Sequence, residues 1–151
     1  MRNLLAGLVM TCALVGGPAL AADLDEVAVR KIEATAYDYV DGQLEGDADR
    51  VARSLHPDLA KRAVKPTPDE ALGLRRMSKE ELVDLTRRGV LKTPRENWDR
   101  KVQVLDIAGD VAVARVETPW FIDYFHLGRF GDRWVIVNAM WQPKPQPAVT
   151  D

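Results

Sequence analysis

The sequence predicts an α+β domain in which three helices precede four consecutive antiparallel strands. Two observations predict this order. Apolar residues recur at helical spacing through residues 23–45, and runs rich in β-branched residues alternate with short Gly-Asp turns after residue 100. Because the period changes to the extended one in the last third of the chain, the helices and the main sheet are expected to be separate layers of one domain.

The longest helix is predicted over residues 23–45. Its apolar side chains form one broad stripe that contains Leu24, Ala28, Ile32, Ala36, Tyr39, Val40 and Leu44. Gly46 ends this helix, and Asp47 is expected to cap a second, shorter helix over residues 48–56. His56 stands at the end of that helix, where we expect its imidazole to bond the last unpaired carbonyls.

A short strand is predicted over residues 59–64, and the prolines that follow it predict an irregular stretch. Ser78 is expected to cap a third helix, since Glu81 lies three residues later and completes a capping box. Gly89 is the expected end of this helix. Residues 90–97 are expected to form a loop.

Two hairpins are predicted in the last third of the chain. Each is turned by a Gly-Asp pair, at residues 109–110 and again at residues 131–132. The predicted strands span residues 100–108, 111–118, 120–130 and 133–141.

The N-terminus predicts export. Arg2 is followed by an apolar run over residues 4–15 and by small residues up to Ala21, the three parts of a cleavable signal peptide. The run is shorter than the roughly 20 residues that cross a bilayer. We therefore expect a signal peptide over residues 1–21, a periplasmic or secreted mature protein with no membrane attachment, a domain over residues 22–142, and a Pro-rich flexible tail over residues 143–151.

Composition excludes several classes of function. The one cysteine, Cys12, lies in the predicted signal peptide, so the mature protein has no thiol for disulfides, metal ligation or nucleophilic catalysis. Acidic and basic residues number 23 and 21, and removing Arg2 takes the formal net charge from −2 to −3. No basic stripe predicts nucleic-acid binding, and no ligand spacing or glycine-rich loop predicts a metal or another cofactor.

Several short motifs carry a resemblance to a known superfamily. They are Tyr39-Val40-Asp41-Gly42, Gly46-Asp47-Ala48, Leu55-His56-Pro57-Asp58, Gly109-Asp110-Val111-Ala112-Val113-Ala114, Asp123-Tyr124 and Gly131-Asp132-Arg133-Trp134. Together they resemble the nuclear-transport-factor-2-like superfamily of ketosteroid isomerases, scytalone dehydratase and SnoaL-like cyclases, and most closely its bacterial putative lumazine-binding branch. The resemblance implies a cone-shaped, curved antiparallel sheet wrapped around the long helix, a pocket between them, and homodimerisation through the sheet.

The pairing register predicts which strand residues share a face. A tight turn at residues 131–132 sets His126 opposite Val137, Tyr124 opposite Ala139, and Ile122 opposite Trp141. In the isomerases the final strand puts an aromatic residue into the pocket near the position of Trp141. By that resemblance this face is expected to point inward, and the face with Asp123 and Phe125 outward.

Four residues are candidates for ligand contacts: Tyr39, Tyr124, His126 and Trp141. They offer phenol donors, a group that titrates near neutral pH and a flat apolar wall, which favours binding of a small apolar or aromatic molecule with little or no catalysis. The alternative is a structural role, in which Tyr124 and His126 are half-buried strand residues hydrogen-bonded to backbone or water.

Two other functions stay open. In a cofactor-independent isomerase, dehydratase or cyclase, His126 would act as the general acid or base and Tyr124 as the oxyanion donor. Asp41 and Asp123 are poorly aimed for such a role, since each is expected to point away from the pocket. In the other alternative, the sheet surface docks another exported protein.

Overall fold

The structure is a computed structural model that describes residues 25–145. The predicted signal peptide and most of the predicted tail, residues 146–151, lie outside the described residues. None of the helices within residues 25–145 combines the length and the apolar character needed to cross a membrane.

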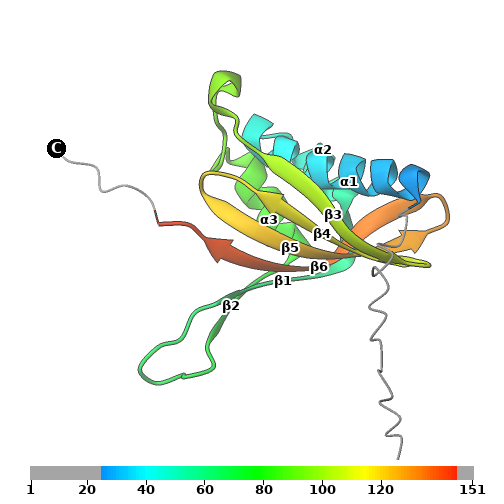
Figure 1. The fold of residues 1–151 in the computed structure, drawn as a ribbon. Coiled ribbons are helices and arrows are strands. Elements are labelled where there is room, and N and C mark those ends of the chain that lie inside the picture. Colours follow the sequence, from blue (N-terminus) through cyan, green and yellow to red (C-terminus); the bar gives the residue numbers. More distant parts are fainter. Residues whose placement is uncertain (1–24, 146–151) are drawn as a thin grey trace, which may run out of the picture.

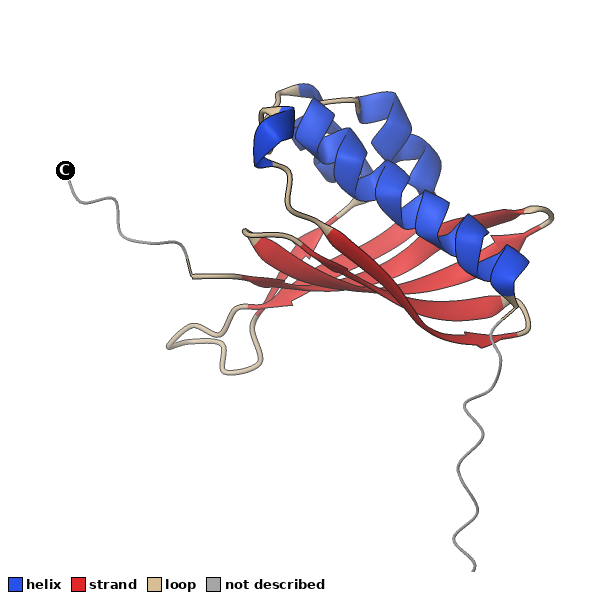
Figure 2. Ribbon diagram, turned by 45° about the horizontal axis from the view of Figure 1, so that its top comes forward, coloured by secondary structure: helices blue, strands red, loops and turns tan. Residues whose placement is uncertain are grey.

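Helices and a curved sheet form two layers, as predicted. Figures 1 and 2 show α1 lying along one face of the sheet, with the shorter helices beside it and the opposite face bare. The helices are α1 (Glu26–Glu45), α2 (Ala48–Ser54) and α3 (Lys79–Arg87), with a 3₁₀ turn, η1 (Arg95–Asn97). The strands are β1 (Leu55–Val64), β2 (Leu74–Met77), β3 (Lys101–Ala108), β4 (Val111–Glu117), β5 (Phe121–Phe130) and β6 (Arg133–Pro143).

Local signals in the sequence set the ends of α1. The Asp25 carboxylate accepts the backbone N–H of Val27 at 2.9 Å, and Gly46 ends the helix with a left-handed φ of 78°. Between these ends Ile32, Ala36 and Val40 of the predicted stripe are fully buried. Burying one large apolar side chain of this kind contributes about 1.5–3 kcal/mol, so the stripe fixes the helix to the sheet.

The sheet is mixed, with strand order β2-β1-β6-β5-β4-β3, and it does not close. The meander of β3 to β6 is confirmed, with Gly109 and Gly131 at φ 62° in its two Gly-Asp turns. Two pairings were not predicted. β1 runs parallel to β6, and β2 pairs with β1 where only irregular chain was expected. The prediction of a wholly antiparallel sheet is therefore wrong at this edge.

The second helix is shorter than predicted, and His56 does not cap it. α2 ends at Ser54, and His56 already belongs to β1. Its Nδ1 accepts the N–H of Asp58 at 3.1 Å, and its ring stacks on Phe130 with the ring centroids 5.2 Å apart. The strand starts before the proline at position 57 because Leu55 already pairs with Ile136 of β6, and the pairing resumes at Ala60 after a register shift.

A β-bulge reverses the predicted faces of the last hairpin. The register between β5 and β6 holds from the turn to Leu127, which lies opposite Ile136, and then shifts so that His126 lies opposite Asn138. Beyond the shift, Asp123 lies opposite Trp141, and both line the inner face. Asp123 is fully buried, whereas Tyr124 is 48% exposed. The expected inward direction of Tyr124 and His126, and the outward direction of Asp123, are thus wrong.

Candidate functional site

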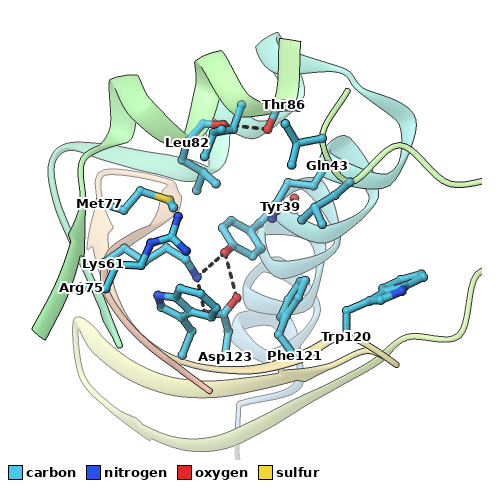
Figure 3. Close-up of a pocket in the computed structure, with 14 residues that line it drawn as sticks. Tyr39, Gln43, Lys61, Arg75, Met77, Leu82, Thr86, Trp120, Phe121 and Asp123 are labelled. Carbon is cyan, nitrogen blue, oxygen red and sulfur yellow. Dashed lines mark hydrogen bonds and ion pairs between the residues drawn. The ribbon is translucent and has the colours of Figure 1, made fainter. Parts of the chain in front are cut away.

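A cavity of about 220 Å³ lies on the inner side of the sheet, between α1, α3 and the strands β1, β2, β5 and β6 (Figure 3). Most of its wall is apolar, with Met77, Leu82, Leu85, Trp120, Phe121 and Trp141 among the lining residues. Its polar lining residues are Tyr39, Gln43, Lys61, Arg75, Thr86 and Asp123. An apolar wall with a few polar groups is the usual composition of a small-molecule site.

Three polar side chains from different elements form a cavity cluster: Tyr39 of α1, Lys61 of β1 and Asp123 of β5. Figure 3 shows them joined at the cavity wall. The Tyr39 hydroxyl donates to Asp123 Oδ2 at 2.8 Å, and Lys61 Nζ donates to Asp123 Oδ1 at 2.5 Å and to the Tyr39 oxygen at 2.8 Å. Both carboxylate oxygens of Asp123 are therefore engaged.

The cavity cluster is almost completely removed from water. Tyr39 and Asp123 are fully buried, and only 6% of the Lys61 side chain is exposed. Burial lowers the pKa of Lys61 although Asp123 favours its charged form, and nearby Arg75 lowers this pKa further. Burial, followed by the negative charge of Asp123, raises the pKa of Tyr39 well above its ordinary value. The Tyr39 hydroxyl therefore stays protonated at neutral pH and donates a hydrogen bond to the carboxylate of Asp123.

Two cations lie near the ring of Trp141. The Lys61 ammonium and the Arg75 guanidinium are each 5.3 Å from its centroid. The indole Nε1 of Trp141 is buried, and it is the one buried side-chain N or O atom within residues 25–145 that has no hydrogen-bond partner. Such an orphaned donor is unusual in a folded protein.

The structure brings together two of the four predicted ligand-contact residues. Tyr39 and Trp141 line the cavity. Tyr124 and His126 lie on the bare face of the sheet, where the Arg115 guanidinium is 5.9 Å from the Tyr124 ring centroid. Within residues 25–145 no group of three histidine, cysteine or acidic side chains is arranged to hold a metal ion.

Sequence reasoning missed Lys61, Arg75 and Asp123. A signal for Asp123 was present, because it alternates with Phe125 and Leu127 along β5 and so shares their buried face. Lys61 likewise alternates with buried residues of β1. Arg75 belongs to β2, a strand that was not predicted.

The other aspartate weighed for catalysis belongs to a separate flank cluster. Arg100 donates hydrogen bonds to both carboxylate oxygens of Asp41, and its Nη2 lies 3.0 Å from Oδ2. Arg50 Nη2 lies 3.5 Å from the same oxygen. Arg50 also donates to Asp38 at 2.8 Å and to Glu45 at 2.9 Å. Asp41 does not line the cavity, so its predicted direction is confirmed.

The two-layer fold with a cavity between the long helix and the curved sheet defines the nuclear-transport-factor-2-like class. Within this class the chain belongs to the family described as "Putative lumazine-binding", whose sequence profile matches residues 27–142. No curated protein matches the chain.

Solved structures share the fold. A nuclear-transport-factor-2-like protein of unknown function from Silicibacter pomeroyi is 16% identical, with a TM-score of 0.66 over 79% of this chain and 98% of its own. Another, from Methylobacillus flagellatus, is 22% identical, with a TM-score of 0.65 over 82% of this chain and 97% of its own. A ketosteroid isomerase-like protein from Erwinia carotovora atroseptica is 17% identical, with a TM-score of 0.53 over 82% and 99% of the two chains. At these identities the likeness concerns the fold alone.

Proposed function

We propose that this protein binds a small, largely apolar molecule in the cavity between α1 and the sheet, without turning it over. The observation that carries this proposal is an apolar and aromatic wall that meets one buried polar cluster. A cavity of about 220 Å³ is smaller than the sites of drug-sized ligands and suits a molecule of one or two rings. Lumazine, which appears in the family name, is a bicyclic heterocycle of this size class.

The absence of turnover is supported by the pairing within the cavity cluster. The three side chains bond one another, and Lys61 and Asp123 form an ion pair rather than an unpaired acid and base. The alternative, an isomerase, dehydratase or cyclase acting through His126 and Tyr124, lacks support from the fold because neither residue lines the cavity.

Export and self-association complete the proposal. The positive, apolar and small-residue parts of residues 1–21 support cleavage after Ala21 and a periplasmic or secreted location. A homodimer is supported by the outer face of the sheet, which no helix covers in Figure 2 and which presents Tyr124 and Met140 at 48% and 44% exposure.

Native mass spectrometry of the protein purified gently from its exporting host tests the proposal. The expected species is a dimer of chains that begin at Ala22, with a small molecule bound in each. A monomer would overturn the proposed dimer, and a chain that still carries residues 1–21 would overturn the proposed export.

Calorimetric titration with 2-naphthamide, a neutral two-ring probe, tests the binding site. Trp141→Ala is expected to weaken binding about 5- to 150-fold, because it removes a stacked aromatic wall worth on the order of 1–3 kcal/mol. Tyr124→Ala, on the opposite face, is the matched control and is expected to leave binding unchanged. The proposed site is wrong if Tyr124→Ala weakens binding and Trp141→Ala does not.

A further inference from the structure

We propose that the ligand of this cavity carries a carboxylate, and that Arg75 binds it at the edge of the aromatic wall. This inference rests on the proposed binding function and adds the chemical class of the ligand. It concerns Arg75 and Trp141, two cavity residues that hold no hydrogen bond to the cavity cluster.

The charges that line the cavity do not balance. Lys61, Arg75 and Asp123 are its charged lining residues. Lys61 and Asp123 form a buried ion pair and cancel each other, and the second oxygen of Asp123 is taken by Tyr39. Arg75, an exposed residue of β2 at the edge of the cavity, therefore adds a positive charge that no lining carboxylate is free to neutralise.

Arg75 has no acidic partner elsewhere either. No carboxylate within residues 25–145 lies within ion-pair distance of its guanidinium. The group lies instead over the Trp141 ring, 5.3 Å from the centroid, and it is close enough to Lys61 to disfavour the charged form of that amine. Figure 3 shows Arg75 and Lys61 at the same side of the cavity. Because Asp123 neutralises Lys61, Arg75 is the cation at this side of the cavity that is available to an anion.

The guanidinium of Arg75 is a donor group at this edge of the cavity that forms no hydrogen bond to another described side chain. A ligand that pairs with Arg75 must bring acceptor oxygens. A guanidinium presents two parallel N–H groups, which match the two oxygens of a planar carboxylate. A flat ring with a carboxylate at its edge would thus stack on the wall and reach Arg75.

A matched pair of probes tests the charge preference. The probes 2-naphthoate and 2-naphthamide share a ring system and differ in charge, and each is titrated calorimetrically into the mature protein. We expect the wild type to bind naphthoate about 10- to 100-fold more tightly, because a charge-assisted bond to Arg75 is available only to the anion. We also expect this preference to shrink as salt is added.

The variant Arg75→Gln is expected to bind both probes equally. Arg76→Gln, a change of the same charge on the same strand at a residue that does not line the cavity, is expected to keep the preference. Equal affinity of the wild type for the two probes, or a preference that survives Arg75→Gln, would overturn this inference and leave the binding function intact. Failure of both probes to bind the wild type would overturn both proposals.

Discussion

The two charged clusters of this protein begin on the same helix and end in different environments. Tyr39 and Asp41, two residues apart on α1, point to different sides of it. Tyr39 joins the cavity cluster, in which one lysine and one aspartate are removed from water. Asp41 joins the flank cluster, in which two arginines that are each about one-quarter exposed share several carboxylates.

The difference separates a cluster that holds two elements together from a cluster that borders the proposed binding site. In the flank cluster Arg100 engages both oxygens of Asp41, and its guanidinium also lies 4.9 Å from the Trp98 ring centroid. The cluster therefore ties the start of β3 to α1 and leaves no donor exposed to a cavity. The cavity cluster borders an open space, with Arg75 and Trp141 beside it. The first arrangement borders no cavity, whereas the second lines the cavity that we propose to be a binding site.

Breaking the cavity cluster is expected to have the largest effect. Lys61→Met leaves Asp123 as an uncompensated buried charge, and we expect the free energy of unfolding to fall by about 3–5 kcal/mol in urea titration. The double variant Lys61→Met/Asp123→Asn removes both charges and is expected to be more stable than Lys61→Met alone. If the double variant is less stable than Lys61→Met, the penalty does not come from the unpaired carboxylate.

The flank cluster is expected to be more tolerant and to have no influence on binding. Asp41→Asn weakens the contacts of Arg100, but Arg50 keeps Asp38 and Glu45 as partners. We expect a loss of about 1–3 kcal/mol in the free energy of unfolding, the range for hydrogen bonds to charged groups. Calorimetric affinity for 2-naphthoate is expected to stay at the wild-type value. A large drop in that affinity would contradict the separation of the two clusters.

A third group of charges, which is partly exposed, is expected to have the smallest effect on stability. Lys144 and Arg115 bond the Glu117 carboxylate and lower its pKa to about 2. Because the folded-state pKa lies below the ordinary value of 4.5, the pairing stabilises the fold above about pH 4.5, and this stability is lost as the pH falls from there towards 2. We expect wild type and Glu117→Gln to differ slightly in urea midpoint at pH 6 and to converge at pH 2. A difference that is the same at both pH values would contradict this assignment.

Local signals predicted most of the fold. The stripe of α1, the caps at Asp47 and Ser78, and the two Gly-Asp turns each depend on residues within a few positions of one another. The parallel pairing of β1 with β6 joins segments about 80 residues apart, and the irregular chain between β1 and β2 hid the second edge strand. Pairings between segments so far apart cannot be predicted from the spacing of neighbouring residues.

The candidate site was predicted only in part because one bulge decides it. Tyr39 followed from its place in the helical stripe, and Trp141 from the resemblance to the isomerases. The register shift leaves Val137 as an extra residue in β6, so Trp141 shares its face with Asp123 and not with Ile122. Because the inward face was chosen from Trp141, Tyr124 and His126 were placed inward in error, and the β-branched side chain of Val137 gives no sign of the bulge.

Indole N–H resonances test most directly the claim that the cavity cluster borders a binding site and the flank cluster does not. The Nε1–H of Trp141 has no partner, whereas that of Trp98, beside the flank cluster, donates to the Thr93 carbonyl at 2.9 Å. In ¹H–¹⁵N spectra recorded during titration with 2-naphthoate, the Trp141 resonance is predicted to move and the Trp98 resonance to stay in place. Movement of the Trp98 resonance with no change at Trp141 would contradict the account.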